Sequence, residues 1–140
     1  MWLNTIQPML IRTLNEIVES NKMNARVEVE ENATNMQPVY ITLGTADSGI
    51  AKIEGEEIEV PFPKEKGALL FSPIYNGKIS TMIKYPNIKG LMQAKAPKML
   101  ELMEPEEMNA EKIEDLLIKF FQEVMDWENQ FNLNNNPIGF

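Results

Sequence analysis

The spacing of the apolar residues changes twice along this chain, from helical to alternating and back, and this change limits the folds open to it. Helical spacing runs over residues 6–18 and, most clearly, over residues 113–131. Between them, apolar and polar residues alternate in several short runs, which is typical of half-exposed strands. Strands grouped between terminal helices predict an α+β fold, with a mostly antiparallel sheet of about five or six strands flanked by an N-terminal helix and a long C-terminal helix.

Both terminal helices carry boundary signals. In the first, Asn4 or Thr5 is a candidate N-cap, Pro8 falls in the first turn and Asn21 is a stop signal. Asn109 is the predicted cap of the second, and acidic residues occupy the face opposite its apolar stripe. The members of that stripe are Ile113, Leu116, Leu117, Phe120, Val124, Trp127 and Phe131.

The strand region contains one strong turn signal. Asn76-Gly77 separates two strand-like runs, residues 68–75 and 78–85. Asn-Gly favours a two-residue type I′ hairpin because both central residues of that turn have positive φ. Pro73, inside the first run, predicts an edge position or a bulge, since proline cannot donate a ladder hydrogen bond.

The remaining segments are assigned by the same rules. The other strand-like runs are residues 26–30, 39–43, 50–54 and 58–62. Residues 44–49 have turn-forming composition, and Gly55-Glu56 predicts a tight turn or a bulge. Pro97 is expected to open a short helix through Met103, which Pro105 would end. Residues 1–131 are predicted to form a single domain, followed by an Asn-rich tail over residues 132–140.

The composition removes several kinds of chemistry. The chain of 140 residues has no cysteine and no histidine, so disulfides, thiolate chemistry and the commonest general base and metal ligand are absent. We therefore expect no metal site and no cofactor. No apolar run approaches the roughly 20 residues that span a bilayer, and residues 1–4 carry no positive charge typical of a signal peptide. These features predict a cytoplasmic protein that does not enter a membrane.

The net charge of −8 is unevenly distributed. Residues 101–128 hold ten acids and two lysines, whereas no acid occurs between Glu65 and Glu101, where six lysines are found. The expected consequence is charge balance within the molecule. The alternative is a polar surface that orients a partner.

Candidate catalytic groups are weak. Asp47-Ser48-Gly49 follows an apolar run and resembles the Asp-Thr/Ser-Gly loop of aspartic proteases, but the second hallmark of that family has no match downstream. These residues are expected to form a turn. The glutamates of residues 54–59 are expected to lie on a solvated face. Nucleotide-binding motifs are missing, and the basic stretch contains lysine without arginine, so no nucleic-acid partner is predicted.

The methionines are the best candidates for binding a partner. Five of the ten fall between residues 82 and 108. Because methionine is unbranched and adapts to varied surfaces, we predict Met92, Met99 and Met103 as partner-binding residues, with another protein or a second copy as the partner. The alternative is that they fill gaps in the core. Phe121 and Met125, if exposed, would extend the C-terminal helix into a dimer seam.

The function expected from these observations is that of a non-enzymatic protein-binding module, an adaptor or a chaperone-like protein. A carboxylate-based hydrolase and a structural subunit of a larger assembly are the alternatives. In size, acidity and terminal helices the chain resembles the small acidic secretion chaperones. Those proteins place a helix within the run of strands, whereas residues 62–67 are too short for one, so the resemblance assigns no residue.

Overall fold

The computed structural model describes residues 1–31, 36–54, 58–88 and 95–134, with the backbone alone for residues 46–54, 58–62 and 131–134. A short π-helical turn, Trp2–Ile6, leads into α1, Gln7–Ser20. The strands are β1 (Arg26–Val29), β2 (Val39–Thr42), β3 (Thr45–Glu54), β4 (Ile58–Glu65), β5 (Ala68–Pro73), β6 (Ile79–Lys84), β7 (Asn87–Ile88) and β8 (Lys98–Met103). A 3₁₀ turn, Pro105–Glu107, precedes the long helix α2, Ala110–Asn134.

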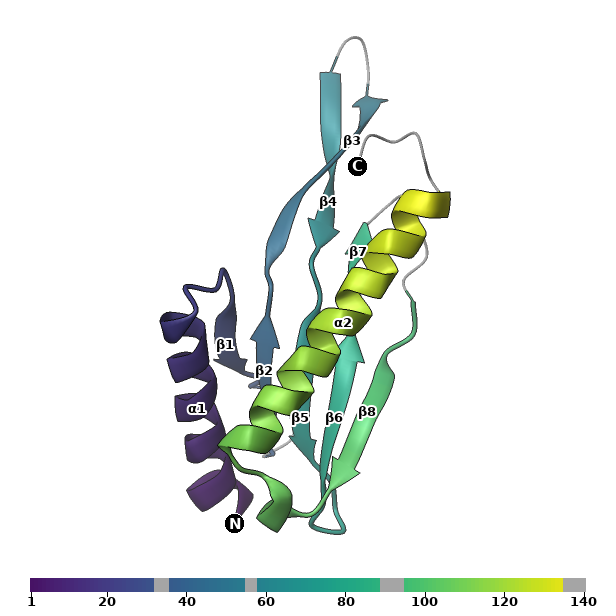
Figure 1. The fold of residues 1–140 in the computed structure, drawn as a ribbon. Helices are drawn as coiled ribbons and strands as arrows, with labels where there is room; N and C mark the ends of the chain where they lie inside the picture. Colours follow the sequence, from purple (N-terminus) through teal and green to yellow (C-terminus); the bar gives the residue numbers. More distant parts are fainter. Residues whose placement is uncertain (32–35, 55–57, 89–94, 135–140) are drawn as a thin grey trace.

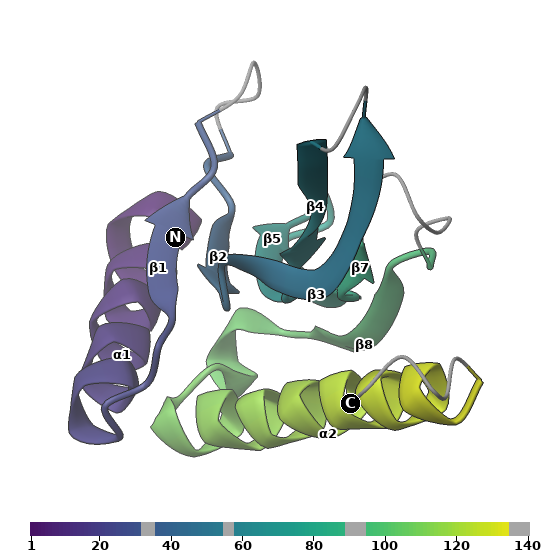
Figure 2. The same cartoon turned by 90° about the horizontal axis from the view of Figure 1, so that it is seen from above.

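The strands form two antiparallel sheets. The larger sheet has the order β1-β2-β5-β6-β8, and the smaller has the order β3-β4-β7. α2 lies across one side of the larger sheet, and α1 stands at its β1 end (Figures 1 and 2). This arrangement is the α+β fold that the change in apolar spacing predicts.

The core lies between the helices and one face of the larger sheet. Alternate residues of β2 and β5 point into it, for example Val39 and Ile41 in β2 and Leu69 and Phe71 in β5, all with 0% exposure. From the helices, the predicted stripes supply the facing side chains. The buried members of those stripes are Ile6, Leu10, Leu14, Ile113, Leu116, Leu117, Phe120 and Trp127.

Helix boundaries follow the predicted signals in part. The side-chain amide of Asn21 donates to the carbonyl of Ile17 (2.9 Å), and the Asn109 side chain accepts from the amide of Lys112 (2.9 Å), so both polar end signals are confirmed. The predicted caps at Asn4 and Thr5 are wrong, because both residues lie within the π-helical turn and Ile6 precedes α1. α2 also continues to Asn134, into the segment expected to be a tail.

Two glycines bend the larger sheet into the smaller one. β2 leads into β3, and β4 leads into β5, across a shared bend. At this bend the amide of Leu43 donates to the carbonyl of Gly67 (3.0 Å), and the amide of Lys66 donates to the carbonyl of Gly44 (2.9 Å). Both glycines have positive φ, +83° at Gly44 and +103° at Gly67. The paired strands therefore leave the sheet together, and β3 and β4 extend beyond its end (Figure 1).

This bend corrects the turn predicted over residues 44–49. These residues are of types that favour turns, but β3 begins at Thr45, which pairs with Glu65. Asp47-Ser48-Gly49 therefore lies in a strand, at a register irregularity between Asp47 and Ala51. Pairing along a long ribbon overrides the local preference, and the bulge accommodates residues that suit a turn. The Gly55-Glu56 turn falls outside the described residues.

The structure also corrects two proline interpretations. Residues 98–103 form the edge strand β8 instead of a short helix, because pairing with β6 offers them a ladder, and Pro97 stands just before the strand. Pro73 lies in β5, which is central in the sheet, but it is the last residue of that strand, where a missing donor interrupts little.

The hairpin at Asn76-Gly77 is confirmed, with a different turn. The amide of Gly77 donates to the carbonyl of Ile74 (3.0 Å), and the amide of Ile74 donates to Lys78 (2.9 Å), so three residues form the loop. Gly77 has φ +83°, whereas Asn76 is not among the residues with positive φ. This matches a type I turn closed by a glycine bulge.

The two bend glycines provide a matched test of stability. A Cβ on Gly67 would lie 3.0 Å from the carbonyl oxygen of Lys84, whereas a Cβ on Gly44 would have no heavy atom within 4 Å. Gly44→Ala should cost about 1–2 kcal/mol of unfolding free energy, from the left-handed backbone alone. Gly67→Ala should cost clearly more, because the neighbouring backbone must also shift. Urea unfolding measures both, and equal losses would contradict the close approach at Gly67.

Candidate binding face

With both helices packed on one face of the larger sheet, side chains on the other face form a row across the strands. The register pairs Glu28 with Tyr40, Tyr40 with Leu70, Leu70 with Met82, and Met82 with Met99. Directly paired residues have Cβ atoms about 4.5–5.5 Å apart, so neighbours in the row touch. We call these five residues the cross-strand row and the face that carries them the open face.

A bulge in β8 brings Met99 into the row. Thr81 pairs with Glu101 but the next residue, Met82, pairs with Met99, so Leu100 is an extra residue. Leu100 packs against the core, while Met99 is 52% exposed. In an unbroken strand Met99 would share a face with Glu101, since side chains alternate with a period of two.

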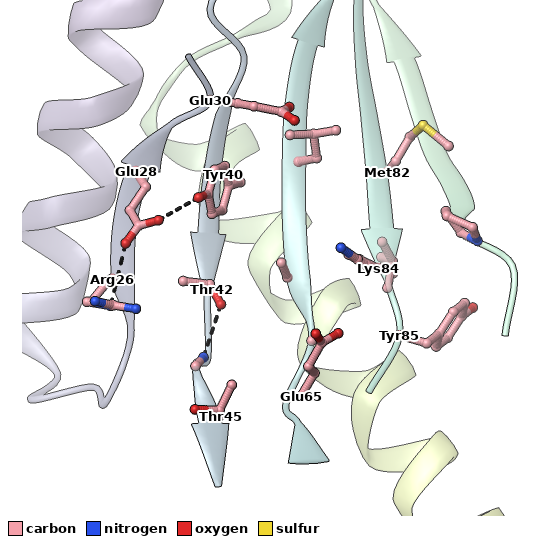
Figure 3. Close-up of a pocket in the computed structure, with 16 residues that line it drawn as sticks. Arg26, Glu28, Glu30, Tyr40, Thr42, Thr45, Glu65, Met82, Lys84 and Tyr85 are labelled. Carbon is pink, nitrogen blue, oxygen red and sulfur yellow. Dashed lines mark hydrogen bonds and ion pairs between the residues drawn. The ribbon is translucent and has the colours of Figure 1, made fainter. Parts of the chain in front are cut away.

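The open face is hollowed beside the row. A cavity of about 490 Å³ lies over Tyr40, Leu70 and Met82, where β2, β5 and β6 approach the bend. Figure 3 shows charged side chains around it on β1, on the residue that follows β1, and on β4 and β6. These are Arg26, Glu28, Glu30, Glu65 and Lys84. The site is thus an apolar strip with a charged rim of both signs.

Hydrogen bonds hold the β1 end of the row. The Tyr40 hydroxyl donates to Glu28 Oε2, and Arg26 Nε lies 3.6 Å from Glu28 Oε1 (Figure 3). The hydrogen bond to Glu28, reinforced by burial, raises the pKa of Tyr40 above its usual value. The phenol therefore stays a neutral donor, and the carboxylate is already occupied by two partners.

A second network closes the cavity near Pro97. Tyr85 is buried, and its hydroxyl donates to Glu123 Oε2 on α2 (2.9 Å), while Lys98 Nζ donates to the other oxygen (2.6 Å). Lys95 Nζ lies 4.2 Å from the centre of the Tyr85 ring. Burial first, and then the bond to Glu123, raises the pKa of Tyr85 to about 12. Hydrogen bonds from Lys98 and Tyr85 lower the pKa of Glu123.

The methionines predicted to bind a partner lie in different places. Met99 is on the open face, whereas Met103 is 1% exposed and pairs with Ile79 on the core side of the sheet. The expected exposure of Met103 is therefore wrong, because the bulge at Leu100 puts it on the other face from Met99. Met92 lies outside the described residues. Tyr40, Leu70 and Met82 were missed, although the alternation of their strands sets each of them opposite a core residue.

Charge pairing within the molecule accounts for part of the uneven charge distribution. Lysines of the basic stretch meet acids of the following segment at Lys98–Glu123 and Lys78–Glu104, the latter at 3.8 Å. Lys64 of β4 pairs with Glu128 of α2 and lies 5.7 Å from the ring centre of Trp127. Lys98–Glu123 joins α2 to the larger sheet, and Lys64–Glu128 joins it to the smaller one.

Other kinds of site find no support in the described part of the chain. Its aspartates and glutamates form no group of three or more that could hold a metal ion. None of its helices is both long enough and apolar enough to cross a membrane. Asp47, the aspartic-protease candidate, lies in β3.

Together these features define a small α+β domain with one helix-covered face and one open face. Comparison of the chain with protein-family models, with curated proteins and with solved structures finds no match.

The Tyr85 network predicts a dependence of stability on alkaline pH. Because the folded-state pKa of Tyr85 lies above the ordinary value of 10.0, its contribution is complete below pH 10 and is lost as pH rises toward 12. Tyr85→Phe should cost roughly 1 kcal/mol at neutral pH and flatten this alkaline decline. Urea unfolding between pH 8 and 12 measures the effect. Tyr75→Phe, at a residue 96% exposed, is the control and should leave the decline in place.

Proposed function

We propose that this protein is a non-enzymatic protein-binding module, an adaptor or chaperone-like protein, and that its open face holds a segment of another polypeptide. The observation that carries the proposal is the cross-strand row. Tyr40, Leu70 and Met82 are half-buried and Met99 is exposed, on the face opposite the core residues of the same strands. Apolar side chains aligned in this way favour a partner that removes them from water.

The residue types in the row suit a partner surface of variable shape. Methionine and leucine supply adaptable apolar contact, and burying one such side chain fully contributes roughly 1.5–3 kcal/mol. Tyr40 offers a flat ring whose hydroxyl is already satisfied by Glu28. The charged rim, with Arg26 and Lys84 among its members, would orient the partner more than it would strengthen binding.

The geometry of the row favours a helix as the bound segment. Strands in a sheet are spaced about 4.8 Å apart, so a row across five strands is about 19 Å long. An amphipathic helix presents apolar side chains about every 5 Å along its axis, because residues three or four apart share a face. A helix of about 13 residues laid across the strands would therefore match the row side chain for side chain.

The test compares variants that keep the fold. Met99→Glu places a charge at the exposed end of the row and should lower the affinity of a partner for the open face at least tenfold, about 1.4 kcal/mol. Partners captured from the native host by the unmodified protein are then measured individually by titration calorimetry against the variant. Tyr75→Glu, at a residue 96% exposed in the loop between β5 and β6, is the control with the same change of charge.

The outcomes of this test are separable. Loss of binding in Met99→Glu with retention in Tyr75→Glu supports the open face as the site. Equal affinity of the unmodified protein and Met99→Glu would contradict it. Self-association that Met99→Glu abolishes would identify a second copy as the occupant and favour a structural subunit.

A further inference from the structure

A second apolar surface lies on the helical side of the molecule, away from the open face. A groove of about 760 Å³ runs between the end of α1 and the first half of α2. Its floor includes Leu117, which is buried, and Leu43, which is half-buried. The apolar residues that line it are Ile17, Met23, Leu43, Leu117, Ile118 and Phe121.

The groove continues along the outer side of α2 as an apolar stripe. Ile118, Phe121 and Met125 are separated by three and four residues, so they lie on one face of the helix. Ile118 and Met125 are each 63% exposed, and Phe121 is half-buried against Phe120, with ring centres 5.4 Å apart. We call the groove together with this stripe the α2 groove. Its spacing is that of a surface on which another helix packs.

Acids outnumber cations beside the α2 groove, although the groove itself is lined by one of each, Glu114 and Lys66. Four exposed acids of α2 lie on its outer side, Glu111, Glu114, Asp115 and Asp126. The two lysines of the helix turn toward β8 instead, where Lys112 pairs with Glu101 and Lys119 Nζ lies 4.0 Å from the other oxygen of the same carboxylate. Lys66, beside Leu43, is the cation among the described residues that line the groove.

We infer that the α2 groove docks an amphipathic helix of a partner protein whose apolar stripe is flanked by lysine or arginine. The apolar residues supply the contact, and the acids favour a partner of opposite charge and disfavour an acidic one. A second copy is a poor occupant, since two outer faces of α2 would bring like charges together. This surface is separate from the open face, so one molecule has room for two partners.

The test uses a synthetic helical peptide with leucine at positions i, i+3, i+4 and i+7 and lysine at the flanking positions. Its affinity is measured by anisotropy of a labelled peptide. Ile118→Glu and Met125→Glu should each weaken binding at least tenfold, although both make the protein more negative. Non-specific attraction of a basic peptide to an acidic protein predicts the opposite change. Tyr75→Glu, with the same added charge at a residue that lies on neither surface, should bind as the unmodified protein does.

Several results would overturn the inference. These are an unchanged or increased affinity in both α2 variants, losses in Tyr75→Glu or Met99→Glu equal to that in Ile118→Glu, or equal binding of a peptide with glutamate in place of each lysine. Sedimentation equilibrium provides a further check, because self-association that is lost in Ile118→Glu would make a second copy the occupant. Since the open face is tested by Met99→Glu, the two proposals can fail independently.

Discussion

The apolar stripe of α2 has to be buried, and the larger sheet offers the surface on which it is buried. Four side chains of the stripe, Ile113, Leu116, Leu117 and Phe120, are at most 3% exposed. Burial of each contributes roughly 1.5–3 kcal/mol. This contact determines which face of every strand is the core face, because side chains alternate along a strand. The residues at the alternate positions then lie on the opposite face, and in this chain they form the cross-strand row.

The helices and most strands could be predicted because their signals are local. The period of apolar residues and polar end signals such as Asn21 and Asn109 act within a few residues, and the structure confirms them. The segments that differ depend on distant partners. Residues 45–49 become strand because Thr45 pairs with Glu65, and residues 98–103 become strand because β6 has a free edge. No short window of sequence contains that information.

The candidate site was predictable only in part for the same reason. Met99 was singled out because methionines cluster in its segment, and it does lie on the open face, but the other four members of the row come from four other strands. Which of the two faces of a strand is left open depends on where the helices pack, and the spacing within one strand does not reveal it. Met103 illustrates this, since it resembles Met99 in type and parity yet contributes to the core.

The extra residue at Leu100 makes the open face depend on chain length as well as on side-chain identity. Residues before the bulge and residues after it alternate out of phase, so Met99 and Leu102 reach the same face although they are three positions apart. If the same residues paired with β6 without a bulge, Met99 would turn toward the helices and Lys98 outward, whereas removal of Leu100 would leave both on their present faces. Related chains should therefore be aligned here by counting residues between Pro97 and Met103, because an insertion in β8, or a deletion at a residue other than Leu100, would change the surface more than a substitution would.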